Sequence, residues 1–75
     1  MSDKMKYYLQ QVQANEAHTI GMPVGPMWVK ISTFVDKANR TFCIQVRETK
    51  TQIAVIVEAY NNGTKQLCFQ EQAAK

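Results

Sequence analysis

The segment Thr51–Tyr60, TQIAVIVEAY, decides the fold of this chain. Thr51 is a suitable N-cap for a helix that would end at Gly63. The stripe of such a helix would consist of Ile53, Ile56, Val57 and Tyr60. β-Branched side chains favour the pleated surface of a sheet, and four apolar ones stand in this short run: Ile53, Val55, Ile56 and Val57. We therefore predict a buried strand, and a helix over residues 51–60 is the alternative.

The neighbouring segments alternate between apolar and polar residues, as strands do. We predict strands at Met27–Asp36, Arg40–Glu48 and Thr64–Gln70. Asn61-Asn62-Gly63 fits a three-residue hairpin loop with Gly63 in the left-handed conformation. Together with residues 51–60, these segments predict a four-stranded antiparallel meander.

Hairpin loops fix which residues lie opposite one another in such a meander. The three loops place Thr33 opposite Phe42, Val46 opposite Ile53, and Val57 opposite Leu67. The second pairing assumes a two-residue turn at Thr49-Lys50. Each step keeps the apolar residues on one face, so the three loops are mutually consistent.

The amino-terminal segment has the pattern of an amphipathic helix. Ser2 is a plausible N-cap, with Asp3 in the first turn. The apolar positions at helical spacing are Met5, Tyr8, Leu9 and Val12. We predict a helix over residues 3–17, although residues 6–12 also fit a strand. Two glycines and two prolines in residues 18–26 predict an irregular or extended connector.

The expected fold class is therefore α+β, in one domain of residues 1–75, with the element order α-β-β-β-β. The sheet spans residues 27–70 and a short tail spans residues 71–75. A helix is about 10 Å wide and four strands are about 19 Å wide, so the helix covers roughly half of the sheet. Curling into a small half-barrel, a second copy or a partner protein would cover the rest. For a chain of 75 residues we favour association.

Residues for catalysis or metal binding are few. His18 is the only histidine, and no Cys-x-x-Cys pair is present. Cys43 and Cys68 are predicted two strands apart, at about 9.6 Å between Cα atoms, which exceeds the roughly 7 Å limit for a disulfide. Glu48 and Glu58 are not predicted to form a close pair. We expect a protein that is not an enzyme, with no catalytic residue, metal or cofactor.

The formal net charge of +3 is small, and the lysines and arginines are scattered among acidic residues. No apolar run approaches the roughly 20 residues of a membrane span, and no secretory signal is visible. We expect a cytoplasmic protein with no membrane partner.

The predicted outer face of the sheet carries aromatic side chains among basic and amide groups. The candidate surface residues are Trp28, Lys30, Phe34, Gln45, Arg47 and Tyr60. Several modules that bind single-stranded nucleic acid stack bases on such a face. Alternatively, Trp28 and Phe34 cover a second hydrophobic contact.

Two functions follow as expectations. The first is a small non-catalytic protein that binds protein, as a homodimer or with another chain, through a sheet face or an edge strand. The predicted edges are residues 27–36 and 64–70. The alternative is a single-stranded nucleic-acid-binding protein that uses the outer face. No known family is identified from the residues.

Overall fold

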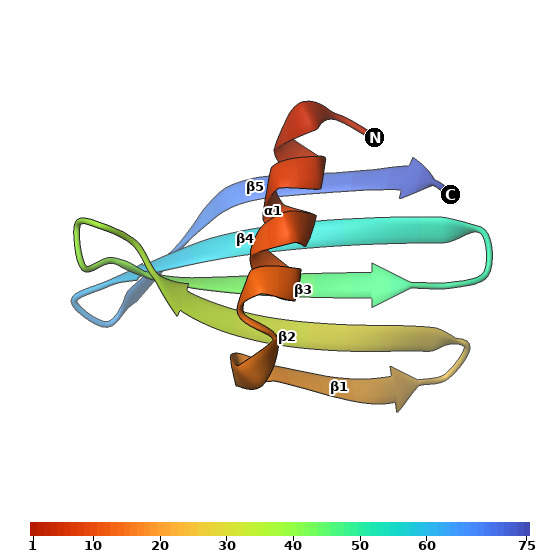
Figure 1. Cartoon of the computed structure of the whole chain (residues 1–75), viewed down its shortest axis with the longest axis horizontal. Helices are drawn as coiled ribbons and strands as arrows, with labels where there is room; N and C mark the ends of the chain where they lie inside the picture. The colour runs from red at the N-terminus through yellow and green to blue at the C-terminus, as the bar shows by residue number, and fades with distance from the viewer.

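A computed structural model describes residues 1–75 and contains one helix packed on one five-stranded antiparallel sheet (Figure 1). The elements are α1 (Asp3–Ala14), the 3₁₀ turn η1 (Glu16–His18), β1 (Thr19–Val24), β2 (Met27–Val35), β3 (Thr41–Glu48), β4 (Gln52–Asn61) and β5 (Thr64–Ala74). The strands follow chain order across the sheet. The predicted α+β class, a helix followed by an antiparallel meander, is confirmed, and residues 52–60 of the segment 51–60 form a strand, not a helix.

Helix α1 begins where the sequence predicts. The Oγ atom of Ser2 accepts a hydrogen bond from the Met5 N–H at 3.1 Å. The helix ends at Ala14 rather than residue 17, because Asn15 donates from its backbone and its side chain to the Gln11 carbonyl. Residues 16–18 continue as the 3₁₀ turn.

The connector predicted at residues 18–26 is largely a fifth strand. Strand β1 pairs with β2, and Ile20 lies opposite Ile31. Gly25, with φ of 59°, occupies the turn between them. Pro23 has no N–H to donate and is tolerated because β1 is an edge strand. The predicted edge at residues 27–36 is therefore wrong, since β2 has a neighbour on both sides.

The loop between β2 and β3 changes the predicted register by one residue. Phe34, not Thr33, lies opposite Phe42. The Asp36 carboxylate accepts hydrogen bonds from the Ala38 and Arg40 N–H groups, at 3.0 and 2.8 Å. Asn39 has a φ of 61°. A slip of one residue moves every side chain of a strand to the other face.

The loop between β3 and β4 is longer than the two-residue turn that we predicted. Thr49 donates its N–H to the Gln52 carbonyl at 2.9 Å, and its Oγ1 atom accepts from the Gln52 N–H at 3.0 Å. Val46 therefore lies opposite Val55 instead of Ile53. Because this shift is two residues, the apolar residues stay on the predicted face.

The last hairpin has a two-residue turn, Asn62-Gly63, with φ values of 50° and 77°. The pairing is irregular after Val57, which lies opposite Phe69, while the next residue, Glu58, lies opposite Leu67. This bulge turns Leu67 away from the helix, contrary to the prediction. Strand β5 continues to Ala74, so the predicted tail at residues 71–75 is mostly strand.

The core lies between α1 and the central strands β3 and β4. Its buried cluster consists of Met5, Val12, Ile44, Val46, Ile53, Val55 and Val57. Tyr8, Leu9, Phe34, Phe42, Phe69 and Ala73 pack around it. Only nine of the 75 residues are buried, so the stability of the domain depends on a small contact area.

We expect Met5→Ala to lower the free energy of unfolding by about 3 kcal/mol, because it leaves a cavity between α1 and the sheet. Met5 is fully buried. Urea unfolding followed by circular dichroism measures the change. Gln10→Ala, on the exposed side of the same helix, is the matched control and should be close to neutral. Equal stability of the two variants would contradict this packing.

Stability should fall in acid because two carboxyl groups have a lowered pKa in the folded chain. Hydrogen bonding from the Arg40 backbone lowers the pKa of Asp36, and hydrogen bonding from Ser2 lowers that of Glu71. Their contribution is complete above the unfolded pKa, near 4, and is lost as the pH falls below it. Urea unfolding between about pH 6 and pH 3 tests this. The double variant Asp36→Asn, Glu71→Gln should lose less stability on acidification than the wild type, and an equal loss would contradict the prediction.

Candidate binding face of the sheet

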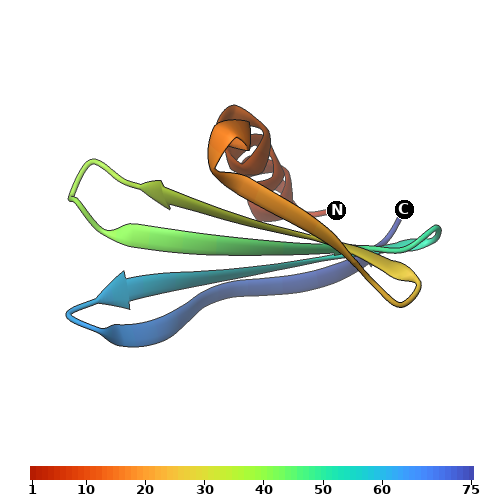
Figure 2. The ribbon, with the colours of Figure 1, turned by 90° about the horizontal axis from the view of Figure 1, so that it is seen from below.

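The face of the sheet opposite α1 has no second layer over it (Figure 2). We call it the open face. Because side chains alternate along a strand, the pairing assigns to it the even-numbered residues of β1 and β4 and the odd-numbered residues of β2 and β3. Strand β5 contributes Lys65, Leu67, Gln70, Gln72 and Ala74.

The half of the open face on β1 and β2 is apolar. Ile20 is 65% exposed and Val35 is 58% exposed, and Met22 and Val24 are also exposed. Val29 is only 5% exposed and is the single buried residue on this face. It lies in register between Met22 and Arg47, away from the core cluster. A small second hydrophobic cluster therefore begins on this side of the sheet.

The half of the open face toward β5 is rich in amides. Gln70 lies opposite Ile56, and Gln72 lies opposite Ala54. The Nε2 atom of Gln72 donates to Oε1 of Gln52 at 2.9 Å. The open face thus changes from aliphatic side chains on β1 and β2 to mainly amide side chains on β5, where Leu67 is an exposed apolar exception.

The charges on the open face lie toward opposite ends of β3 and β4. Arg47 donates from Nε to Oε1 of Gln45 at 2.9 Å and forms no salt bridge within the chain. Glu58 pairs with Lys65, with 3.5 Å between Oε2 and Nζ. Glu58 also lies opposite Cys43 in the sheet. Burial, and then the Glu58 charge, raise the pKa of the Cys43 thiol, which keeps it neutral and favours packing over reactivity.

The structure divides the six predicted surface residues between two faces. On the open face lie Gln45, Arg47 and Tyr60. On the helix face lie Trp28, Lys30 and Phe34. The cause is the one-residue shift at the Asp36 loop. The six residues therefore do not form one continuous surface.

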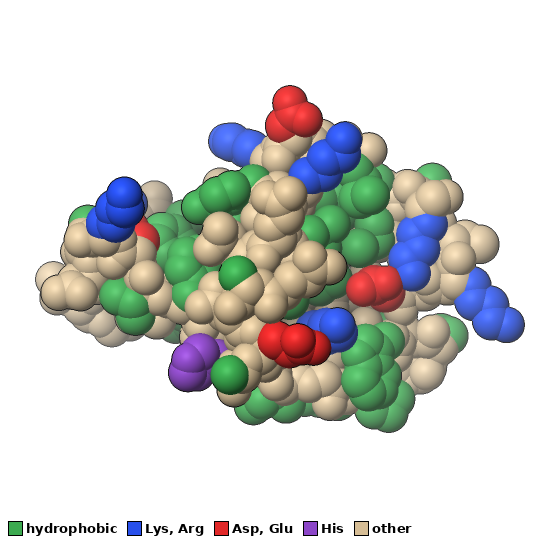
Figure 3. All heavy atoms as spheres, viewed as in Figure 1, with side chains coloured by type: hydrophobic (Ala, Val, Ile, Leu, Met, Phe, Trp, Pro, Cys, Tyr) green, Lys and Arg blue, Asp and Glu red, His purple; other side chains and the backbone are tan.

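The three residues on the helix face have different surroundings. Phe34 stacks on Phe42, with 5.4 Å between ring centroids, at the edge of the core. Trp28 lies against Gly21, where an added Cβ would be 2.8 Å from Cζ2 of the indole. Figure 3 shows this face, with hydrophobic side chains on both sides of α1 and charges scattered among them.

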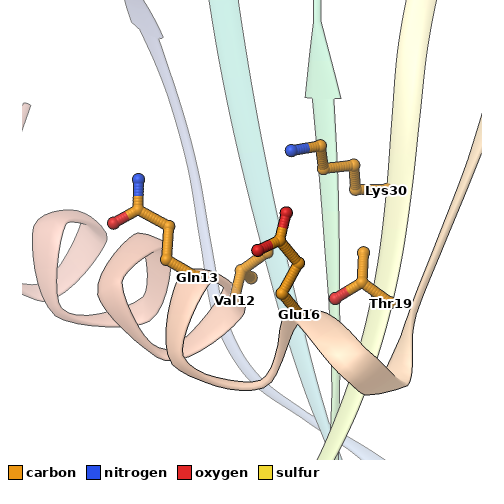
Figure 4. Close-up of a pocket in the computed structure, with 5 residues that line it drawn as sticks. All are labelled: Val12, Gln13, Glu16, Thr19 and Lys30. Atoms are coloured by element: carbon orange, nitrogen blue, oxygen red, sulfur yellow. The ribbon is translucent and has the colours of Figure 1, made fainter.

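Lys30 lines a shallow cavity of about 360 Å³ between α1 and the strands (Figure 4). The other lining residues are Val12, Gln13, Glu16 and Thr19. The cavity thus holds one cation and one carboxylate, and it has no excess of positive charge to attract an anion. It is a polar recess beside the helix end.

The residues needed for metal binding do not cluster. No group of three or more His, Cys, Asp or Glu side chains is placed to hold an ion. Cys43 and Cys68 are both free thiols. None of the helices combines the length and the apolar character needed to cross a bilayer.

The sequence prediction missed the apolar residues of β1. Ile20, Met22 and Val24 do alternate, but Gly21 and Pro23 between them gave the segment the character of a loop. Their spacing of two residues was the available signal of a strand.

Comparisons with protein-family models, with curated proteins and with solved structures give no match to this chain. The geometry of the open face is therefore the basis on which a function can be inferred.

Proposed function

We propose that this protein is a small non-catalytic binding protein that associates with another protein chain through its open face. The partner is a second copy of the same chain, so the product is a homodimer. The observation that carries the proposal is the exposed apolar surface of β1 and β2, which no element of the chain covers. Exposed apolar patches of this kind are typical of interaction sites.

The size of the open face suits a stable interface. Five strands at about 4.8 Å, each with about eight residues at about 3.3 Å, give a footprint of roughly 600 Å². A standard protein interface buries about 800 Å² on each partner. The side chains add to the flat footprint, so the two areas are of similar size.

The faces are better suited to association than the edges. Edge strand β1 has six residues and contains Pro23, which cannot donate a backbone hydrogen bond. Edge strand β5 has a bulge between Leu67 and Phe69, where it pairs with β4. Both features discourage pairing with another strand. A face-to-face contact also adds buried area to a chain that buries only nine residues alone.

A cytoplasmic location is part of the proposal. Two free thiols, Cys43 and Cys68, are consistent with a reducing compartment.

We expect Ile20→Lys to weaken self-association by roughly tenfold or more, because it places a charge in the apolar half of the open face. Sedimentation velocity over micromolar concentrations measures the monomer–dimer equilibrium. Tyr7→Lys is the matched control, since Tyr7 is similarly exposed but lies on α1. A wild-type chain that stays monomeric, or an Ile20→Lys variant that dimerises normally, would contradict the proposal.

We expect single-stranded oligonucleotides to leave the fluorescence of Trp28 unchanged. Glu48 lies opposite Trp28 on the helix face, whereas Arg47 lies on the open face, so no basic and aromatic platform forms. The titration is made at low and at high salt. Quenching that weakens steeply with salt would contradict this expectation and favour the nucleic-acid alternative.

A further inference from the structure

We infer that the two copies pack open face to open face about a two-fold axis that runs across the strands, with Arg47 of each copy above the row that contains Glu58 of the partner subunit. This inference rests on the proposed function. It adds the symmetry of the dimer and one pair of charges that determines it.

Two orientations of the axis must be compared. Sheets that pack face to face in an aligned sandwich keep their strand directions within about 30° of one another. The two-fold axis then lies close to the strand direction or close to the perpendicular to it. An axis across the strands places each strand over the same strand of the partner, reversed in direction. An axis along the strands, through the central strand β3, places β1 and β2 over the partner's β5 and β4.

The distribution of apolar residues favours the axis across the strands. In that arrangement the apolar half, with Ile20 and Met22, lies on the same half of the partner, Gln70 lies over the partner's Gln70, and Gln72 lies over the partner's Leu67. The other axis places Met22 over the partner's Gln72. An amide buried against an aliphatic side chain loses its hydrogen bonds to water and gains none in return, which disfavours the contact. The first arrangement has one such contact in each copy, at Gln72, and the second has two, because Ile20 then also lies over the partner's Gln70.

The charges favour the same axis. Ile31, Gln45, Ile56 and Gln70 form the central row of the open face. Arg47 lies in the next row on one side, and Cys43 and Glu58 lie in the next row on the other. An axis along the central row therefore brings Arg47 over the partner's Glu58 row, twice by symmetry. The axis along β3 would place Arg47 over the partner's Arg47, where like charges repel.

The side chains have the capacity and the reach for this contact. The Arg47 guanidinium uses only Nε within its own chain, so its terminal nitrogens are free to donate. Lys65 contacts only Oε2 of Glu58, which leaves Oε1 to accept. Packed sheets lie about 10 Å apart, and an arginine and a glutamate extended toward each other span that gap.

The test is a charge-reversal series measured by sedimentation equilibrium, with circular dichroism to confirm folding. Arg47→Glu and Glu58→Arg should each weaken the dimer by about tenfold. The double variant should return to within about threefold of the wild type, because each reversed charge again faces its opposite. Lys6→Gln is the matched control, since it removes a positive charge from the exposed side of α1, away from the open face, and should change the dissociation constant by less than about threefold.

The variant Arg47→Gln distinguishes between the two orientations of the two-fold axis. An axis across the strands predicts a weaker dimer, whereas an axis along β3 predicts a tighter one because the facing arginines are removed. A wild-type dimer that is sensitive to Ile20→Lys, but in which Arg47→Gln tightens binding and the double variant does not recover, would overturn this inference alone. A wild-type chain that is monomeric at all concentrations would overturn the proposed function and this inference together.

Discussion

The hydrogen bonds of the Asp36 carboxylate are the constraint on which the rest of the structure depends. By accepting from the N–H groups of Ala38 and Arg40, this side chain holds three residues in the loop, with Asn39 in the left-handed conformation. The loop length determines which face of β2 lies under α1. As a result Phe34 packs beside the core, and Val29 and Ile31 lie on the open face. A loop one residue shorter would exchange these two sets.

The position of α1 determines where the uncovered surface lies. Its buried residues, Met5 and Val12, pack on β3 and β4, and the chain then turns through η1 into β1. At this end of the helix face, a hydrogen bond between the hydroxyls of Thr19 and Ser32 joins β1 to β2, in place of apolar packing. The helix is too narrow to cover five strands. The apolar side chains of β1 lie on the open face because of their register with β2, and α1, on the other side of the sheet, leaves them exposed.

The sequence predicted the elements well and the faces only in part. Alternation fixes the two faces within one strand, but the relation between strands depends on loop conformation. The predicted register at the Thr49 loop was wrong by two residues, which left the faces unchanged. The predicted register at the Asp36 loop was wrong by one residue, which exchanged the two faces of β2. The hydrophobic pattern could not reveal this reversal, because β2 has apolar residues on both faces. Of the candidate site, Gln45, Arg47 and Tyr60 were placed on the outer face, as predicted, and the residues of β2 were not.

The two-sided character of β2 has a physical meaning. A strand with apolar residues on both faces is typical of a sheet covered by two layers, and a strand with one polar face is typical of a sheet covered by one. Strand β3 is of the second kind, since Gln45 and Arg47 face outward. Strand β2 is of the first kind, with Val29 and Ile31 facing outward and Phe34 facing α1. The need for a second layer is therefore greatest at β1 and β2, and a partner that covered only this half would remove most of the unfavourable exposure. Arg47, at the border of this half, then acts more on the orientation of the partner than on the strength of binding.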